Sequence, residues 1–292
     1  MLQRLKLTLD MIKFEHSVFA LPFALTGALL AVREDGFETA GLAVKLVWIV
    51  VAMVGARSAA MAFNRLLDQD IDARNPRTAT RHLPAGLLGR GFAWAFTAVS
   101  AAIFLLAAWQ LNELCLKLAP LALAVVMGYS YTKRFTSLSH VVLGIALGIA
   151  PSAAWVAIRG TVDWRTLWLT AAVMLWTAGF DIIYSCQDTD FDRRAGLFSL
   201  PSRLGTGPAL MLSRVMHLGM LFCLAALVQS FQLGGIAMAG VALVAALLAY
   251  EQSLVSPTDF SRVNAAFFTV NGYVSVLFFF FWAADILWEK VF

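Results

Sequence analysis

Seven of the 18 acidic residues in this chain fall in two short segments that repeat one spacing. The segments read Asn64-Arg-Leu-Leu-Asp68-Gln-Asp70-Ile-Asp72 and Asp181-Ile-Ile-Tyr184-Ser-Cys-Gln-Asp188-Thr-Asp190-Phe-Asp192. On an α-helix, residues four and eight positions apart lie on one face, about 6 Å apart per step. The spacing therefore predicts one face carrying Asn64, Asp68 and Asp72, and a second face carrying Asp181, Tyr184, Asp188 and Asp192.

Two such faces turned toward each other would bring four carboxylates together, which is strongly repulsive unless cations neutralise them. Magnesium prefers a few carboxylates together with the phosphates of a substrate. The spacing therefore predicts a site that holds a diphosphate through Mg²⁺. Solvated acids at a helix end would explain one such segment, but they give no reason for two that match.

Basic side chains are interleaved with these acids. Arg77 follows the first segment, and Lys133 and Arg134 follow a later apolar stretch. A guanidinium group binds phosphate through two parallel N–H donors, and a lysine adds a point charge. We expect these three residues to bind substrate. The excess of Lys and Arg that cytoplasmic loops carry is the alternative explanation.

Three further residues are expected to contact substrate. Arg57 lies seven positions before Asn64, about 10 Å deeper on nearly the same helix face. An arginine inside a membrane is costly, which predicts a role in binding an anionic group such as a carboxylate; a structural ion pair is the alternative. Asp181 is expected to bind or deprotonate an acceptor hydroxyl. Tyr184 is expected to hydrogen-bond the diphosphate or to stack near a cation.

The remaining polar residues predict less. Asn264 and Asn271 lie seven positions apart and either line the cavity or bond between helices. The four histidines, which include His16 and His140, show no metal-ligand spacing. The three cysteines are widely spaced, so neither a disulfide framework nor a metal site is expected from them.

The elements that must position these residues are membrane helices. Of the 292 residues, 60% are hydrophobic and 14% are charged, which excludes an ordinary soluble enzyme, a disordered chain and a typical nucleic-acid-binding protein. A membrane-spanning helix needs about 20 mostly apolar residues. The nine stretches that qualify are 16–32, 44–66, 92–111, 114–131, 139–158, 166–187, 208–230, 233–251 and 264–288.

Most of the 22 Lys and Arg residues then fall on one side, which places the N-terminus and both acidic segments at the cytoplasmic face. The expected fold is an all-α, polytopic membrane bundle of nine transmembrane helices, with residues 1–292 as a single domain. The matching segments suggest that spans 1–4 and 5–8 form a pseudo-repeat, with span 9 extra. The runs are too long for the strands of a membrane barrel.

At these residues the chain resembles the UbiA superfamily of intramembrane prenyltransferases. Asn64, Asp68 and Asp72 match the signature NxxxDxxxD, and Asp188 with Asp192 match DxxxD, preceded by Asp-x-x-Tyr. The segment Arg77-Thr-Ala-Thr-Arg81-His82-Leu-Pro resembles the RT-x-x-RPLP loop of that family, with His82 where proline is usual. Lys133-Arg134-Phe-Thr followed by Val141-Val-Leu-Gly resembles the 4-hydroxybenzoate polyprenyltransferase branch.

The resemblance implies transfer of a polyprenyl group from polyprenyl diphosphate to an aromatic acid in respiratory quinone synthesis, at a bacterial inner membrane. Mg²⁺ would neutralise the departing diphosphate. The implied ligands are Asn64, Asp68, Asp72, Asp188 and Asp192. Asp181 would be catalytic with Asp68 and Asp188, and Asp181 would orient the acceptor with Arg134 or Arg57. The expected acceptor is 4-hydroxybenzoate, and a naphthoate of menaquinone synthesis is the alternative.

A secondary transporter is the main rival, since transporters also have many helices, repeats and intramembrane charges. Their sites cluster near the middle of the bilayer, whereas the acids here lie at the inner helix ends. A lipid phosphotransferase also uses membrane aspartates with Mg²⁺, but its D-x₂-D-G-x₂-A-R pattern is absent. No nucleic-acid partner is expected, and nothing in the sequence identifies a protein partner.

Overall fold

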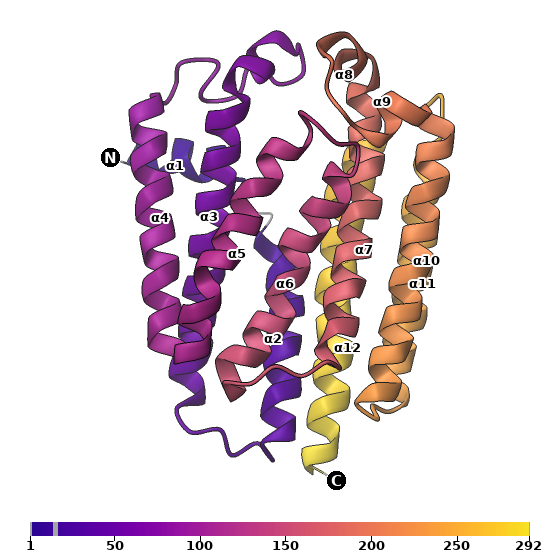
Figure 1. The fold of residues 1–292 in the computed structure, drawn as a ribbon. Coiled ribbons are helices and arrows are strands. Elements are labelled where there is room, and N and C mark those ends of the chain that lie inside the picture. The colour runs from indigo at the N-terminus through magenta and orange to yellow at the C-terminus, as the bar shows by residue number, and fades with distance from the viewer. Residues whose placement is uncertain (1, 14–16, 292) are drawn as a thin grey trace.

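The computed structural model describes residues 2–13 and 17–291, and these ranges form helices joined by loops (Figure 1). The all-α class is therefore confirmed. The elements are α1 (Leu2–Met11), α2 (Ser17–Glu34), α3 (Leu42–Arg74), α4 (Arg90–Leu111), α5 (Glu113–Thr132), α6 (Ser139–Arg159), α7 (Thr166–Ser185), the 3₁₀ turn η2 (Cys186–Asp188), α8 (Thr189–Ala195), α9 (Leu200–Leu204), α10 (Thr206–Ser230), α11 (Gly235–Ser253), the π-helix η3 (Ala265–Val270) and α12 (Asn271–Val291).

Eight helical segments of the described chain are long and apolar enough to cross a membrane. They are Leu42–Arg74, Arg90–Leu111, Glu113–Thr132, Ser139–Arg159, Thr166–Ala195, Thr206–Ser230, Gly235–Ser253 and Ala265–Trp288. The first predicted span, 16–32, coincides with α2, which is not among the eight and which begins beside residues outside the description. The count of nine spans, the side of the N-terminus, the single domain and the pseudo-repeat stay predictions.

Helix α3 is longer than the sequence pattern predicted. It runs to Arg74, two turns beyond the expected end at residue 66, so that the whole first acidic segment is helical. The helix stops where Asn75 turns to an extended conformation, with φ −93° and ψ 117°. Pro76 is the next residue, and a proline disfavours the helical conformation in the residue before it.

The second acidic segment does not form the one continuous helix that its spacing predicts. The four side chains expected on one face nevertheless line the same pocket, namely Asp181, Tyr184, Asp188 and Asp192. Helix α7 ends at Ser185, a 3₁₀ turn follows, and α8 begins at Thr189. Hydroxyl side chains accompany the break: Ser185 Oγ donates to the carbonyl of Ile182, and Thr189 Oγ1 to that of Cys186, both at 2.8 Å. Such local bonds compete with the regular helical ladder.

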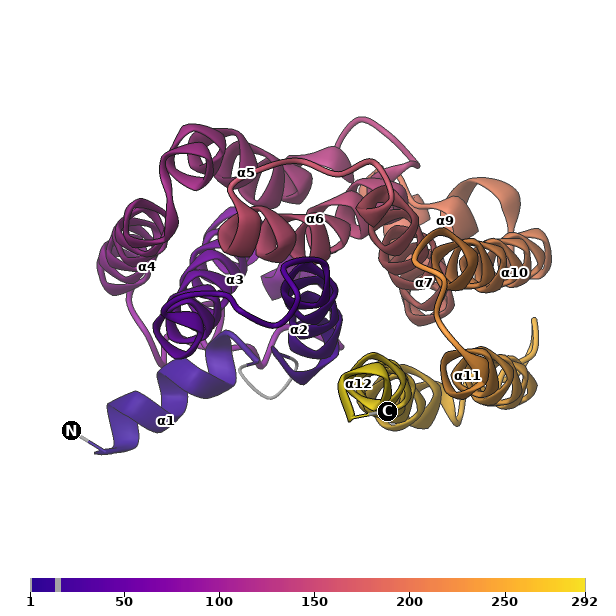
Figure 2. The same ribbon diagram turned by 90° about the horizontal axis from the view of Figure 1, so that it is seen from below.

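Helices α2, α6 and α7 form the middle of the bundle. Helix α7 packs between α6 and α10, while α2 packs against α3, α6 and α12, as Figure 2 shows from one end. Large buried rings fill the contact between α2, α7 and α12, with Phe23 4.9 Å from Trp176 and 4.6 Å from Phe278 between ring centroids. Burial of such rings is a major stabilising contribution to helix packing.

Helices α6 and α7 approach closely because α6 presents glycines to α7. A Cβ atom built on Gly144 would lie 2.3 Å from the carbonyl oxygen of Met174, and one on Gly148 would lie 2.7 Å from that of Thr170. Small residues allow helix backbones in membranes to come this near. The close approach holds the first turn of α6 beside the last turns of α7, at the end of the bundle where α8 and α9 lie (Figure 1).

Candidate active site

A pocket of about 240 Å³ opens at this end of the bundle. Both acidic segments and two of the predicted basic residues line it, namely Asn64, Asp68, Asp72, Arg77, Lys133, Asp181, Tyr184, Asp188 and Asp192. The structure thus brings together segments that are far apart in the sequence. A second pocket, of about 520 Å³, lies around Arg33 and Arg165 at the other end of the bundle. Although it is larger, neither acidic segment lines it, and we do not assign it to this chemistry.

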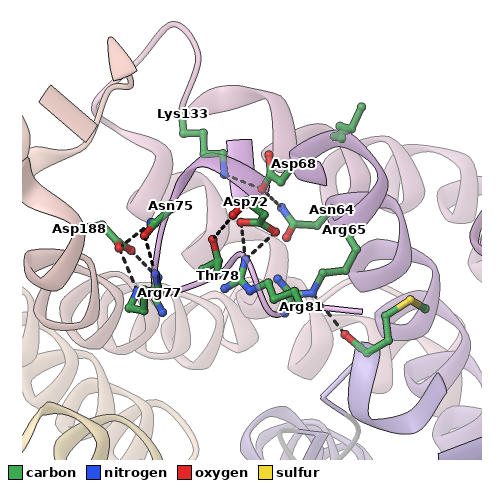
Figure 3. A network of polar contacts seen from close by, with 12 residues as sticks. Asn64, Arg65, Asp68, Asp72, Asn75, Arg77, Thr78, Arg81, Lys133 and Asp188 are labelled. Atoms are coloured by element: carbon green, nitrogen blue, oxygen red, sulfur yellow. Dashed lines mark hydrogen bonds and ion pairs between the residues drawn. The ribbon is translucent and has the colours of Figure 1, made fainter. Parts of the chain in front are cut away.

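Asp68 is the most buried acid of the first segment, with 2% of the residue exposed. Lys133 Nζ donates to its Oδ2 at 2.5 Å, and Asn64 Nδ2 donates to the same oxygen at 3.1 Å (Figure 3). Arg134 Nη2 donates to the other oxygen, Oδ1, at 3.1 Å. Two cations therefore neutralise this carboxylate, which meets the requirement for burying a charge.

Arg134 lies outside the pocket lining. Its guanidinium group donates to the carbonyls of Ser130 and Leu67, both at 2.8 Å, besides contacting Asp68. The side chain thus joins the last turn of α5 to α3. In this arrangement Arg134 positions Asp68, and its contact with substrate stays a prediction.

Asp72, one turn beyond Asp68, is held by the loop that follows α3. Arg81 Nη1 donates to both of its carboxylate oxygens, at 2.7 and 2.8 Å, and Thr78 Oγ1 donates to its backbone carbonyl at 3.0 Å (Figure 3). The sequence pattern identified Arg81 only as part of a loop motif. Its contact with Asp72 shows that the loop folds back over the end of its own helix.

The same loop reaches across to the second acidic segment. Arg77 Nε donates to Asp188 Oδ1 at 2.9 Å, Nη2 also binds this carboxylate, and Asn75 Nδ2 donates to Oδ1 at 3.0 Å. Arg77 Nη1 donates to the hydroxyl of Tyr184 at 3.0 Å. Burial lowers the pKa of Arg77, but the hydrogen bonds and charge of Asp188 more than offset burial, so that the pKa is raised above its ordinary value.

Asp192 and Asp181 contact no arginine or lysine among the described residues; their partners are Ser199 and His140. Asp192 Oδ2 accepts a hydrogen bond from Ser199 Oγ at 2.8 Å. Asp181 Oδ2 lies 2.7 Å from Nδ1 of His140, which comes from the first turn of α6. Sequence spacing gave no role to His140; the signal available was its place shortly after the Lys133-Arg134 pair. His16 lies outside the described residues.

The predictions for Arg57 and for the pair Asn264 and Asn271 have different outcomes in the structure. Arg57 does not line the pocket; it lies about two turns below Arg65, which does, and its Nε is buried without a hydrogen-bond partner in the described chain. Its role in substrate binding stays a prediction.

Asn271 bonds between helices, since it accepts from Trp176 Nε1 at 2.6 Å and donates to Glu251 Oε1 at 3.0 Å. Asn264 is exposed and does not line the pocket.

A model of the UbiA prenyltransferase family matches residues 20–284 of the chain. The chain belongs to the UbiA prenyltransferase family. Together with the apolar helices, this makes it a multi-pass membrane protein. The resemblance inferred from the two acidic segments is confirmed.

Curated relatives of this UbiA family member include two bacterial proteins named 4-hydroxybenzoate octaprenyltransferase. The one from Tolumonas auensis is 32% identical over 223 residues, which are 76% of this chain and 77% of that protein. The one from Aliivibrio fischeri (strain MJ11) is 29% identical over 245 residues, which are 84% of this chain and 85% of that protein.

Solved structures of UbiA homologs share the fold. The apo structure of a UbiA homolog from Aeropyrum pernix K1 is 37% identical, with a TM-score of 0.82 over 94% of this chain and 98% of that one. A UbiA homolog from Archaeoglobus fulgidus bound to GPP and Mg²⁺ is 19% identical, with a TM-score of 0.72 over 96% and 99% of the two chains. At that identity the likeness extends to the fold alone.

The donor chemistry of the pocket fits a hard divalent cation. Five side chains with oxygen ligands line it, namely Asn64, Asp68, Asp72, Asp188 and Asp192, and oxygen-rich sets of this kind suit Mg²⁺. Within the described ranges, no three His, Cys, Asp or Glu side chains are gathered closely enough to hold an ion. Asp68, Asp72 and Asp188 instead pair with Lys133, Arg81 and Arg77. These ion pairs balance the charge of the carboxylates within the protein itself.

Proposed function

We propose that this chain transfers a polyprenyl group from polyprenyl diphosphate to 4-hydroxybenzoate, in respiratory quinone synthesis. The observation that carries the proposal is one pocket lined by both acidic segments together with Arg77 and Lys133. Membership of the UbiA prenyltransferase family and the names of the curated relatives support it. The chemistry is the attack of an aromatic ring carbon on the first carbon of the prenyl group. A carbon–carbon bond forms there as the bond to diphosphate oxygen breaks, and the ring carbon then loses its proton to a base such as the released diphosphate, which restores the aromatic ring.

The diphosphate binds at the acidic segments in this proposal. Asn64, Asp68, Asp72, Asp188 and Asp192 would hold Mg²⁺, which supplies stabilisation of the charge that develops on the departing diphosphate. Arg77 and Lys133 line the same pocket, and their N–H donors suit phosphate oxygens. Each is paired with a carboxylate here, so binding of the diphosphate involves exchange of these ion pairs.

The aromatic acceptor binds deeper in the pocket. Asp181 lies about two turns before Asp188 and would accept a hydrogen bond from the acceptor hydroxyl. Tyr184 lies between them, with its hydroxyl bonded to Arg77, and would face the diphosphate. The apolar interior of the bundle would keep water from the allylic cation, so that the ring carbon beside the hydroxyl is the nucleophile that reaches it.

The membrane setting suits both substrates. The polyprenyl tail is apolar and would remain among the helices or in lipid, while the charged diphosphate stays at the end of the bundle. The distribution of Lys and Arg supports a cytoplasmic pocket, and the bacterial relatives support the inner membrane.

The test is a transfer assay with purified protein in detergent, supplied with Mg²⁺, farnesyl or octaprenyl diphosphate and a panel of aromatic acids, with products identified by mass. The expected product is prenylated 4-hydroxybenzoate, and it should disappear in the Asp188→Asn variant. A product formed only with 1,4-dihydroxy-6-naphthoate would overturn the acceptor. No product with any acid, together with coupled solute flux in vesicles, would favour a transporter instead.

A further inference from the structure

We infer that His140 is a positioning residue for the acceptor: it fixes Asp181 so that one carboxylate oxygen remains free to bind the acceptor hydroxyl. This inference rests on the proposed function. His140 Nδ1 lies 2.7 Å from Asp181 Oδ2. The histidine side chain is 4% exposed and the aspartate side chain 24% exposed, and both residues line the pocket.

The contact made by Nε2 of His140 determines which ring nitrogen carries the proton. The backbone N–H of Leu200 points at Nε2 of His140, at 3.3 Å. A backbone amide can only donate, so Nε2 must offer its lone pair. The proton of the neutral imidazole is therefore on Nδ1, and the bond to Asp181 runs from Nδ1–H to Oδ2.

This bond leaves Asp181 with one engaged oxygen and one available oxygen. Oδ2 accepts from His140, while Oδ1 has no hydrogen-bond partner among the described residues. Holding one oxygen fixes the plane and direction of the carboxylate. A group held this way loses little freedom when a ligand binds, which improves both affinity and orientation.

The contact also links Asp181 to the segment before α9, whose residues Phe198 and Ser199 line the pocket. Leu200 begins α9, and Ser199 before it donates to Asp192 Oδ2 at 2.8 Å. One residue earlier, the N–H of Phe198 donates to the carbonyl of Lys133 at 2.8 Å. Residues 198–200 thus touch Lys133, Asp192 and His140 in turn, so the orientation of Asp181 depends on the segment that also holds Asp192.

Two substitutions separate the two bonds of His140. In His140→Asn the amide nitrogen falls near the position of Nδ1, so the variant keeps a donor for Asp181 and loses the acceptor for Leu200. In His140→Gln the amide falls near the position of Nε2, so the variant keeps the acceptor for Leu200 and loses the donor for Asp181. Both remain small polar side chains, and thermal unfolding in detergent checks that each variant folds.

The kinetic readout is the Michaelis constant for each substrate separately. We expect His140→Gln to raise KM for 4-hydroxybenzoate about 10-fold, as for a lost hydrogen bond to a charged group, and to leave KM for the prenyl diphosphate unchanged. His140→Asn should stay within about 3-fold of the wild type for both substrates. Equal effects of the two variants, or a parallel rise in both KM values, would show that His140 only fills space.

A spectroscopic readout is independent of activity. In protein labelled with ¹⁵N-histidine, the imidazole signal that is lost in His140→Asn should report a neutral ring with its proton on Nδ1. A ring protonated on Nε2, or on both nitrogens, would overturn the inference. A wild-type protein that makes no prenylated product overturns the proposed function, whereas the imidazole spectrum of the same sample still decides whether His140 donates to Asp181.

Discussion

Arg77 pairs with Asp188 across 111 positions of the sequence, with Nε 2.9 Å from Oδ1, and its Nη1 also donates to the hydroxyl of Tyr184 at 3.0 Å. The contact joins the loop after α3 to the turn before α8. It therefore connects the ends of the two acidic segments through one side chain. The raised pKa of Arg77 keeps this guanidinium charged at any pH at which the protein works.

Removing this contact should weaken binding of the diphosphate. We expect Arg77→Ala to raise KM for the prenyl diphosphate by about 10-fold or more, because a charged fork that can bind phosphate is lost. Arg77→Lys should restore part of the affinity, since a point charge remains. The measurement is steady-state kinetics with each substrate varied in turn.

Arg74→Ala is the matched control for Arg77. Arg74 is exposed at the end of α3, three positions before Arg77, and its Nε donates to the carbonyl of Asp70 in the same helix at 3.2 Å. This variant should retain wild-type constants. An equal rise in KM for the two variants would mean that general loss of positive charge, and not the geometry of Arg77, governs binding.

Asp68 should be needed for Mg²⁺-dependent binding of the prenyl diphosphate, whereas Asp70 should not be needed. Asp68 is buried in the pocket, whereas Asp70 is exposed on another face of α3, two positions away. We expect Asp68→Asn to lower activity at least about 100-fold and to abolish the rise in Tm that Mg²⁺ and a prenyl diphosphate together give the wild type. Asp70→Asn should keep both. Loss of the Tm rise in both variants would contradict a specific ligand role for Asp68.

The helical spacing of the first acidic segment was sufficient to predict its geometry. Asn64 and Asp68 lie on one face, and the amide of the first donates to the carboxylate of the second. The length of α3 was not predictable from hydropathy, because its last two turns are polar. Those turns are stabilised by side-chain bonds such as Arg81 to Asp72, which come from a loop and leave no periodic signal.

For the second acidic segment, the spacing predicted the residues of the site but not the backbone conformation. Its spacing matches that of the first, but the backbone changes from α to 3₁₀ between Ser185 and Thr189. Matching spacing therefore predicted the right residues in one pocket without the right helix. His140 was missed for a related reason: its partner Asp181 is 41 positions away, and only the close approach of α6 to α7 brings them together.

Asn271 should matter for stability. It is fully buried and connects Trp176 Nε1 to Glu251 Oε1. Asn271→Ala would leave Trp176 Nε1 and Glu251 Oε1 without these hydrogen bonds, and each such unsatisfied buried group costs about 1–3 kcal/mol. We expect a clearly lower Tm in detergent. Asn264→Ala, at an exposed position seven residues earlier, should unfold like the wild type, and a similar Tm for both variants would argue against the network.

The role of Arg57 can be tested by measuring how its replacement changes both substrate binding and thermal stability, because the two are expected to change in opposite directions. Its Nε is buried without a hydrogen-bond partner among the described residues, so replacing the side chain with leucine should remove the cost of an unsatisfied N–H and of a charge inside the membrane, and raise Tm. If Arg57 binds the carboxylate of the acceptor, the same Arg57→Leu variant should raise KM for 4-hydroxybenzoate by about 10-fold or more and leave KM for the prenyl diphosphate unchanged.

A phenol that lacks the carboxylate isolates this contact of Arg57. It should be a poor acceptor for the wild type, and Arg57→Leu should not make it poorer, because the interaction is already absent. A structural ion pair makes the reverse prediction, since breaking it would lower Tm and affect both acceptors equally. A stabilised variant that loses affinity only for the carboxylated acceptor would therefore place Arg57 in the acceptor site, although it lies below the lining of the pocket in this structure.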